Sequence, residues 1–351
     1  MISKLSVRNF KSLRDVQIDL QPFTMFVGAN GSGKSSILQA LDFLCRSFHF
    51  QAGEEALRLE MSRGSVGPVE LIVESGGNGY GFRAGSSSKA MPMRRQIGEP
   101  KWSGDGCGFT PDISSQAWEP WSPQGTDSTW PPQSRLFRLE ASNLIQATSN
   151  PDVEGMTSDG RGLHSALASM VLNDPDTWLK LQADLQKIVP AIRRIRHTPP
   201  AANKPAALLF DTTRADALPA TQVSEGTLLV LGLLAAFYAP DRPNVILLDD
   251  LDHGLHPKAQ KDLISLLRGL LATNPDLQLL ATTHSPYMLD CMDPAEVRMT
   301  WLEDGSTVCA PLASHPNFEQ WKDEMYPGEM WSLFGEDWVA KQAVTAHGES
   351  A

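Results

Sequence analysis

One short stretch constrains the fold more than any other. Residues 28–35 read GANGSGKS and match the phosphate-binding loop pattern G-x-x-x-x-G-K-[ST] at every position. Glycines in such a loop let successive backbone N–H groups turn toward phosphate oxygens, where a side chain would block the approach. Lys34 can reach the β- and γ-phosphates, and the Ser35 hydroxyl can ligate Mg²⁺. The residues expected to contact the nucleotide are Asn30, Gly31, Ser32, Gly33, Lys34, Ser35 and Ser36.

The residues around the loop predict its structural context. Residues 24–27 read TMFV, a short buried strand before the loop. After the loop, apolar residues fall on one stripe of a helix, namely Ile37, Leu38, Leu41 and Leu44. The N-terminus of that helix adds its dipole to phosphate binding. The unit is therefore expected to be strand, loop and helix in an α/β fold.

A pair of carboxylates marks a second candidate site. Residues 244–248 form a near-continuous apolar run, typical of a central parallel strand, and the run ends in Asp249 and Asp250. Ligands collect at the carboxyl ends of such strands. We expect Asp249 to hold Mg²⁺, directly or through water, and Asp250 to orient or deprotonate the attacking water. A helix cap or turn is the alternative for the Asp pair, and a transition-metal site is the alternative for His253 and His256.

Two further segments have both a functional and a structural interpretation. Ser224 is placed to cap a helix over residues 227–236 that is apolar on nearly all sides, as expected of a buried helix. Residues 279–283 read as a buried strand that delivers His284 to the ligand-binding edge of the sheet. A capped core helix and a histidine with a purely structural role would give the same sequence patterns, so both interpretations stay open.

Composition limits the class of protein. The chain has 351 residues, 41% of them hydrophobic and 20% charged, as in soluble globular proteins. No apolar run approaches the ~20 residues of a membrane helix, and the N-terminus does not resemble a signal peptide. The four cysteines are scattered, which suits a reducing cytoplasm. Because the net charge is −11, nucleic acid could be contacted only through a local basic patch.

The remaining segments predict the domain organisation. We expect one ATP-binding domain over residues 1–310 and a C-terminal helical extension over residues 311–351. Within the domain, residues 76–134 are rich in Gly, Ser and Pro and predict an irregular insertion. Its tryptophans either pin the insertion to the core or form a binding surface; they are Trp102, Trp118, Trp121 and Trp130. Residues 135–223 predict a mainly helical lobe, and Asp304-Gly305 predicts a β-hairpin.

Five segments in order resemble the ABC-type ATPases of the SMC, RecF and OLD branch. They read VRNFKSL, GANGSGKSS, VSEG, VILLDDLDHGLHP and TTHSP, within residues 1–45 and 135–290. The resemblance implies an α/β P-loop NTPase fold: an ABC-ATPase-like head with a mostly parallel central sheet, an antiparallel β lobe and a helical lobe. It also implies ATP hydrolysis, with ATP and Mg²⁺ as cofactors.

The resemblance assigns roles residue by residue. Ser224 and Gly226 would form the signature loop, which contacts the γ-phosphate on the opposite protomer. Asp249 would be the Walker B carboxylate, and Asp250 stands where the family usually has a catalytic Glu. Residues 254–257 would form the D-loop, His284 would be the switch histidine, and Lys34 would act in catalysis.

The chain also departs from the family pattern. Asp250 is one methylene shorter than Glu, which predicts slow turnover. Glu225 stands where transporters favour Gly, and the Q-loop glutamine could be Gln133 or Gln146. No heptad run predicts coiled-coil arms, and no D-x-D motif after His284 indicates a Toprim nuclease domain.

The function predicted from these features is an ATP-driven switch. It would dimerise around ATP and act with DNA or a separate effector protein, such as a nuclease, in DNA repair or anti-phage defence. The alternatives are the ATPase subunit of a transporter and a structural module with weak hydrolysis. A basic cluster could contact DNA or be a solvated face of the helical lobe; it comprises Arg193, Arg194, Arg196 and His197, with Lys187 and Lys204 nearby. A C-terminal helix with Trp331, Phe334 and Trp338 on one face could dock the effector or pack on its own core.

Overall fold

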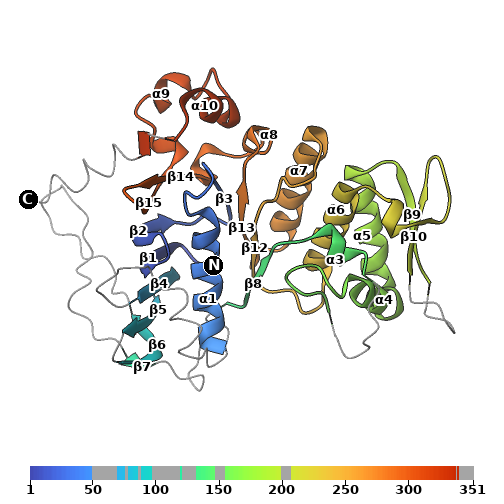
Figure 1. Cartoon of the computed structure of the whole chain (residues 1–351), viewed down its shortest axis with the longest axis horizontal. Coiled ribbons are helices and arrows are strands. Elements are labelled where there is room, and N and C mark those ends of the chain that lie inside the picture. The colour runs from blue at the N-terminus through green and yellow to red at the C-terminus, as the bar shows by residue number, and fades with distance from the viewer. Residues whose placement is uncertain are drawn as a thin grey trace, which may run out of the picture.

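The computed structural model describes most of the chain. The described residues are 1–49, 69–75, 78–85, 88–96, 119–120, 132–146, 155–198, 207–336 and 338–339. They form a central six-stranded sheet, an antiparallel six-stranded sheet and a small three-stranded sheet, and helices pack around the central sheet (Figure 1). The tryptophans expected in the insertion (Trp102, Trp118, Trp121 and Trp130) lie outside the described residues, as does Lys204.

The central sheet has the strand order β15-β14-β3-β13-β12-β8. Its strands are β3 (Phe23–Gly28), β8 (Ser134–Phe137), β12 (Val245–Leu248), β13 (Gln278–Thr283), β14 (Val297–Glu303) and β15 (Ser306–Pro311). All neighbours pair in parallel except β14 and β15. Every residue of β3, β12 and β13 is buried, as expected of parallel strands covered on both faces. The predicted parallel central sheet is confirmed.

An antiparallel sheet forms the second layer. It has the order β2-β1-β4-β5-β6-β7, with β1 (Lys4–Phe10), β2 (Leu13–Asp19), β4 (Val69–Ser75), β5 (Asn78–Gly85), β6 (Ser88–Gln96) and β7 (Glu119–Pro120). Helix α1 (Lys34–His49) shares one hydrophobic core with this sheet and the central one, and its predicted apolar stripe is fully buried. The prediction of an irregular insertion from residue 76 is wrong over residues 78–96, which extend this sheet as a hairpin.

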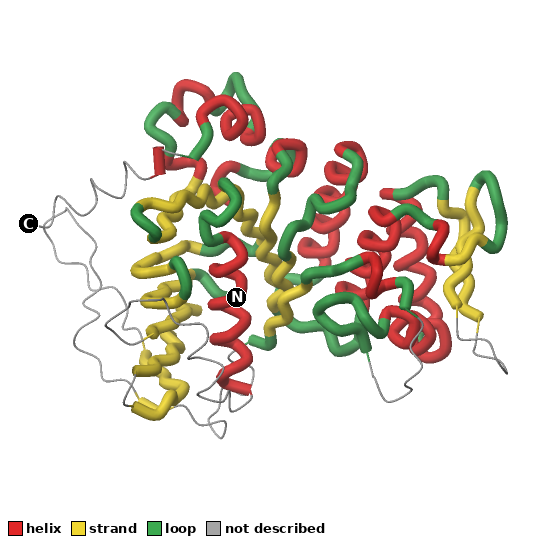
Figure 2. The backbone as a smooth tube through the Cα atoms, in the orientation of Figure 1, coloured by secondary structure: helices red, strands yellow, loops and turns green. Residues whose placement is uncertain are grey.

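The helical lobe lies on the other side of the central sheet (Figures 1 and 2). It contains α3 (Ala141–Leu144), α4 (Leu163–Asn173), α5 (Pro175–Ile188) and α6 (Glu225–Tyr238), and α7 (Pro257–Thr273) packs beside them. Residues 192–219 are not helical as predicted. They form the three-stranded antiparallel sheet β9 (Ile192–Thr198), β10 (Ala207–Thr212) and β11 (Leu218–Pro219), followed by a short 3-10 turn, η1 (Ala220–Gln222).

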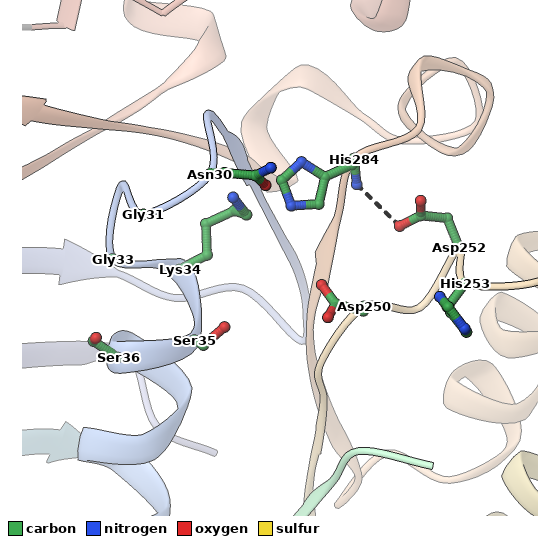
Figure 3. A pocket seen from close by; sticks show the side chains of 10 residues that line it. All are labelled: Asn30, Gly31, Gly33, Lys34, Ser35, Ser36, Asp250, Asp252, His253 and His284. Atoms are coloured by element: carbon green, nitrogen blue, oxygen red, sulfur yellow. Dashed lines mark hydrogen bonds between the residues drawn. The ribbon is translucent and has the colours of Figure 1, made fainter. Parts of the chain in front are cut away.

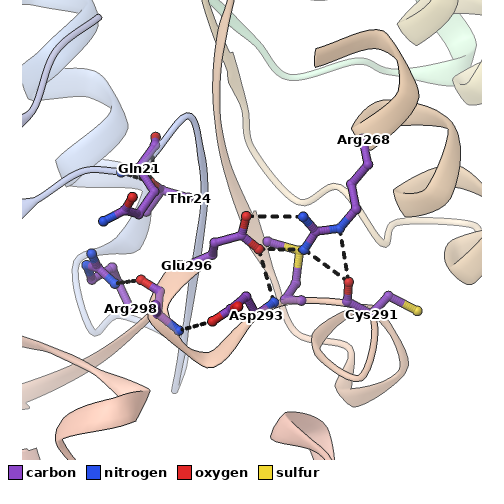
Figure 4. Close-up of polar contacts among 9 residues, drawn as sticks. Gln21, Thr24, Arg268, Cys291, Asp293, Glu296 and Arg298 are labelled. Atoms are coloured by element: carbon purple, nitrogen blue, oxygen red, sulfur yellow. Dashed lines mark hydrogen bonds and ion pairs between the residues drawn. The ribbon is translucent and has the colours of Figure 1, made fainter. Parts of the chain in front are cut away.

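A polar cluster joins α7 to the start of β14 (Figure 4). Arg268 on α7 donates to the Glu296 carboxylate at 3.1 Å and to the Cys291 carbonyl at 3.3 Å. The Arg298 guanidinium donates to the carbonyls of Asp19 at 2.8 Å and Ala295 at 2.6 Å. Burial lowers the pKa of Arg298. These charge-assisted hydrogen bonds fix the helix against the strand ends opposite the phosphate loop.

The C-terminal part contains the predicted hairpin and a shorter helix than predicted. Asp304 and Gly305 connect β14 and β15 with φ of 47° and 74°, as an Asp-Gly hairpin turn requires. The short helices are α8 (Pro286–Leu289), η2 (Pro294–Glu296), η3 (Leu312–Ser314), α9 (Phe318–Trp321) and α10 (Pro327–Phe334). Helix α10 ends because Gly335 follows with a φ of 62°.

The aromatic residues near α10 pack within their own chain. Trp338 lies beyond the end of the helix rather than on its predicted face, and it is 6% exposed in the main core. Phe334 stacks on Trp321 with 3.8 Å between ring centroids. The alternative that these residues pack on their own chain therefore describes them: Trp338 packs in the main core and Phe334 packs on α9. None of the described helices is both long and apolar enough to cross a membrane.

Candidate nucleotide-binding site

The phosphate loop connects β3 to α1 and has a conformation that glycine permits. Gly33 has a φ of 101°, and a Cβ there would lie 2.1 Å from the Thr307 hydroxyl of β15. A Cβ on Gly28 would lie 2.1 Å from the Thr300 carbonyl of β14. The close approach of these two strands leaves no room for side chains at either position. The loop therefore lies against the sheet with its outer side free.

A cleft of about 430 Å³ lies beside the loop (Figure 3). Its lining residues are Asn30, Gly31, Gly33, Lys34, Ser35, Ser36, Asp250, Asp252, His253 and His284. Most of the predicted site residues are thus brought together from three distant parts of the sequence. Ser32, Asp249, Ser224 and Gly226 do not line the cleft, and each has a different location. Asp252 lines it without having been predicted, and so does His253, which the sequence suggested only as a transition-metal ligand.

Ser32 lies inside the loop. It is 1% exposed, and its hydroxyl is 2.6 Å from the Thr300 hydroxyl. The Ser32 side chain therefore anchors the loop to β14. It supports the loop and does not line the cleft.

Lys34 holds the loop together from within. Its ammonium donates to the carbonyls of Gly28 at 2.8 Å and Ala29 at 2.9 Å. Burial lowers the pKa of Lys34, while the carboxylates of Asp250 and Glu336 act in the opposite direction. A partly desolvated ammonium favours an anionic ligand.

Asp249 lies directly behind the cleft wall. Its Oδ1 accepts hydrogen bonds from the Ser35 hydroxyl at 2.9 Å and the Thr282 hydroxyl at 2.8 Å. Its Oδ2 forms an ion pair with the Arg138 guanidinium. Two oxygen ligands on adjacent corners of an octahedron around Mg²⁺, with bonds of ~2.1 Å, lie ~3.0 Å apart. The 2.9 Å between Ser35 Oγ and Asp249 Oδ1 therefore fits a magnesium site formed by these two residues.

The transition-metal alternative gains no support. His256 caps α7, where its Nδ1 accepts a hydrogen bond from the Lys258 amide at 3.3 Å. His253 faces Glu225, with 3.5 Å between Nε2 and the carboxylate. In the described part of the chain, no group of three or more His, Cys, Asp or Glu side chains is arranged to hold a metal ion.

Asp250 faces the cleft from the end of β12 (Figure 3). Its backbone has a φ of 56°, and its amide donates to the Thr282 hydroxyl at 2.8 Å. Asp and Asn tolerate this left-handed conformation better than other side chains. The backbone thus favours the short carboxylate over the Glu that is usual in the family. Its carboxylate lies across the cleft from Lys34 and Ser35.

His284 is positioned by a carboxylate that the sequence interpretation missed. Asp252 accepts a hydrogen bond from the His284 amide at 2.9 Å (Figure 3). It accepts a second one from the Thr283 hydroxyl at 2.8 Å. These contacts hold the end of β13 beside the loop after β12. The only signal in the sequence was the third Asp of the D-D-L-D segment, which by itself reads as a turn residue.

The signature segment lies beside the cleft and not in it. Ser224 caps α6 as predicted, since its hydroxyl accepts a hydrogen bond from the Thr227 amide at 3.4 Å. Gly226 packs against the loop after Asp250, and a Cβ on Gly226 would lie 2.5 Å from the Gly254 carbonyl. The segment and that loop are therefore in direct backbone contact. Ser224 itself is exposed.

Neither predicted Q-loop glutamine reaches the site. Gln133 precedes β8, and its carbonyl accepts a hydrogen bond from the Val245 amide at the opposite end of the strand. Gln146 donates to the Asn143 side chain at 3.2 Å. The side chain that leaves the carboxyl end of β8 for the site is Arg138, which reaches Asp249. This contact joins residues that are 111 positions apart.

The basic cluster lies on β9 and not on a helix. Arg193 pairs with Asp216, and Arg196 pairs with Asp211 at 2.5 Å. Both acids lie in or near the neighbouring strand β10, so the arginines are compensated within the small sheet. Arg194 is exposed and forms no ion pair with a described residue. The alternative of a solvated face therefore accounts for most of this cluster.

If the chain contacts duplex DNA through β9, log K should fall by only about one per log unit of salt. Each neutralised phosphate contributes a slope of about −0.9, and Arg194 is the arginine of this cluster that forms no ion pair with a described residue. Fluorescence anisotropy with a labelled duplex across a salt series measures the slope, and Arg194→Gln should flatten it. A slope of about −3 would instead show that Arg193 and Arg196 leave their carboxylates for phosphates.

The fold and the cleft define a P-loop ATPase head. A family model described as "AAA ATPase domain" matches residues 1–75, and one described as "AAA domain, putative AbiEii toxin, Type IV TA system" matches residues 121–290. Among solved structures, an Smc head bound to the C-winged helix domain of ScpA aligns with a TM-score of 0.55 and 17% identity, over 89% of this chain and 98% of that one. The Smc head of Pyrococcus furiosus, bound to the C-terminal domain of ScpA, aligns with a TM-score of 0.55 and 15% identity, over 92% and 99%.

Curated relatives match over shorter stretches. The OLD nuclease of Thermus scotoductus is 46% identical over 44 residues, which are 12% of this chain and 8% of that protein. The DNA replication and repair protein RecF of Colwellia psychrerythraea is 44% identical over 54 residues, 15% of this chain and 14% of RecF. The matched part is therefore a small share of each relative. Together with the family models and the head fold, these matches support a RecF/SMC/OLD-like P-loop ATPase.

Proposed function

We propose that this chain is a cytoplasmic switch that binds and hydrolyses ATP, dimerises around it and passes its nucleotide state to a separate effector protein or to DNA. One observation carries the proposal. The cleft gathers Lys34, Asp250 and His284 at the carboxyl edge of the central sheet, while the exposed Ser224 caps a buried helix outside it. In this proposal, the first group processes the nucleotide of its own protomer, and Ser224 contacts the nucleotide of the other protomer.

Within one cleft, each side chain has a distinct task. The loop amides and Lys34 bind the β- and γ-phosphates, and Ser35 with Asp249 would hold Mg²⁺. The metal supplies neutralisation of the charge that develops on the phosphates. Asp250 orients the attacking water and accepts its proton, and His284 contacts the γ-phosphate. Asp252 keeps His284 in place through its amide.

In this proposal, the dimer uses the N-terminus of α6. The exposed Ser224 caps this end, and a helix N-terminus attracts phosphate. In this proposal, the γ-phosphate bound to one protomer contacts Ser224 and Gly226 of the other. Two clefts then close around two nucleotides, as the resemblance to the SMC, RecF and OLD branch implies.

Replacing Ser224 by arginine should abolish dimer formation while ATP binding to the monomer persists. The long side chain would occupy the space that the partner's phosphate needs. Light scattering of an Asp250→Asn protein with ATP, with and without Ser224→Arg, measures the assembly. Ser169→Arg is the matched control, since Ser169 is an exposed serine on α4 of the same lobe. A dimer that persists in Ser224→Arg, or a parental protein that stays monomeric with ATP, would contradict the composite site.

The effector, in this proposal, contacts the outer face of α10. The aromatic residues that the sequence suggested for this contact pack within the chain; they are Trp331, Phe334 and Trp338. Tyr326 and Leu333, in contrast, are 65% and 67% exposed. Helix α10 also packs on α8, which begins two residues after His284, so in this proposal it reports the state of the cleft. Co-purification with the product of a neighbouring gene, comparing the parent with Tyr326→Ser/Leu333→Ser, tests this contact. A neighbouring permease gene would favour the transporter alternative.

A further inference from the structure

Arg138 occupies a junction between the ATP-binding core and the helical lobe. It follows β8 directly and begins the segment that runs into α3. Its amide donates to the Ser158 carbonyl at 2.9 Å, which ties the segment to the loop before α4. Its side chain turns the other way and reaches Asp249 at the end of β12. One residue thus contacts both the lobe and the proposed metal ligand.

The ion pair between Arg138 and Asp249 is asymmetric. The Asp249 side chain is 1% exposed, whereas the Arg138 side chain is 56% exposed. Hydroxyl groups already satisfy Oδ1 of Asp249, but Oδ2 has Arg138 as its partner. A buried carboxylate needs a compensating charge, and this guanidinium supplies it. The half-exposed Arg138 guanidinium can replace this contact with hydrogen bonds to water at a small cost in free energy. The buried Asp249 carboxylate has no such access to water.

We propose that Arg138 is a metal gate: it competes with Mg²⁺ for the Asp249 carboxylate and leaves it when the metal arrives with ATP. The inference rests on the proposed ATPase function. Two cations beside one carboxylate repel each other, so the guanidinium on Oδ2 and a metal on Oδ1 each weaken the other's interaction with Asp249. Arg138 is therefore a positioning residue that sets how much Mg²⁺ the site requires. Its departure breaks a contact between the core and the segment that enters the helical lobe.

The test compares three full-length proteins for Mg²⁺-dependent binding of a fluorescent, non-hydrolysable ATP analogue. Arg138→Gln removes the competing charge and should lower the half-saturating free Mg²⁺ by about tenfold, the order of one charge-assisted hydrogen bond. Arg135→Gln is the matched control, because Arg135 lies on β8, three residues before Arg138, and pairs with the exposed Asp241 at 3.1 Å. It should bind the analogue with the parental Mg²⁺ dependence.

Thermal melting adds a readout that needs no nucleotide. In EDTA, Arg138→Gln should melt below the parent because Asp249 loses its counter-charge, and Mg²⁺ should restore more of the difference than it does for Arg135→Gln. If Arg138→Gln folds poorly, Arg138→Lys gives the same comparison with a smaller shift in the same direction, since lysine keeps the charge but not the planar fork.

The outcomes separate the gate from the function on which it rests. An unchanged or raised Mg²⁺ requirement in a folded Arg138→Gln protein, beside normal binding by the parent, would overturn the gate alone. A raised requirement would show that Arg138 assists the metal. A parental protein that binds no analogue at any Mg²⁺ concentration would overturn both the ATPase proposal and the gate.

Discussion

Lys34→Ala should lose nucleotide binding by at least about a hundredfold and show no turnover above background. The ammonium of Lys34 is the one cationic side chain among the residues that line the cleft, and it would exchange two carbonyl contacts for contacts with phosphate oxygens. Charge-assisted hydrogen bonds of this kind are about twice as strong as neutral ones. Alanine removes them and leaves the phosphates facing Asp250 and Asp252 without compensation.

Titration with a fluorescent ATP analogue and a phosphate-release assay measure the two effects. Lys180→Ala is a suitable control, because Lys180 is an exposed lysine on α5, a helix that contributes no residue to the lining of the cleft. Thermal melting should show both proteins folded. If Lys34→Ala bound the analogue as tightly as Lys180→Ala, the cleft would not be the nucleotide site.

Asp250→Asn should keep ATP binding and slow hydrolysis by about 10² to 10⁴-fold. The change removes the proposed base but leaves Ser35 and Asp249 intact, and a positioned general base contributes a factor of this size. Asparagine also accepts the left-handed backbone at this position, where φ is 56°, so the loop should keep its shape. The variant therefore isolates the chemistry from the fold.

Asp304→Asn controls for the same substitution elsewhere. Asp304 has a φ of 47° in the β14–β15 hairpin, so the chemical change and the backbone region are matched while the cleft is untouched. Single-turnover measurements with ATP separate binding from the chemical step. Parental hydrolysis by Asp250→Asn would show that another group activates the water.

The parts predicted correctly from the sequence are those with local and redundant signals. The phosphate loop combines a fixed spacing with a strand before it and an apolar stripe after it. β12 and β13 are fully buried, so their apolar runs indicate parallel strands without any knowledge of their partners. Asp304-Gly305 specifies its turn by backbone preference alone. In each case neighbouring residues carry the information.

Strand β9 was missed because its local pattern is misleading. Its buried residues Ile192 and Ile195 are three apart, a helical spacing, in place of the two expected for a strand. The irregular register between Asp211 and Thr212 of β10 allows this spacing in a sheet. The neighbouring arginines hid the strand further, since they read as a solvated helix face.

Arg138 and Asp252 were missed for a different reason. Their contacts join segments far apart in the sequence: Arg138 to Asp249, and Asp252 to Thr283 and His284. No local pattern marks an arginine that meets a buried carboxylate only after β8 and β12 pair. The family pattern predicts a Q-loop glutamine in this region, whereas the side chain that reaches Asp249 is that of Arg138.

The backbone contact between Gly226 and Gly254 would couple the two nucleotide sites of the proposed dimer. Since even a methyl group at residue 226 would collide with the Gly254 carbonyl, the start of α6 cannot shift without moving the loop that begins at Asp250. In the proposed dimer, a γ-phosphate of the partner protomer that binds at the start of α6 would thus affect the position of Asp250, the proposed base, in the same protomer as that helix. The two sites would then behave as one allosteric unit, in which a single bound ATP is an incomplete signal and the second completes it.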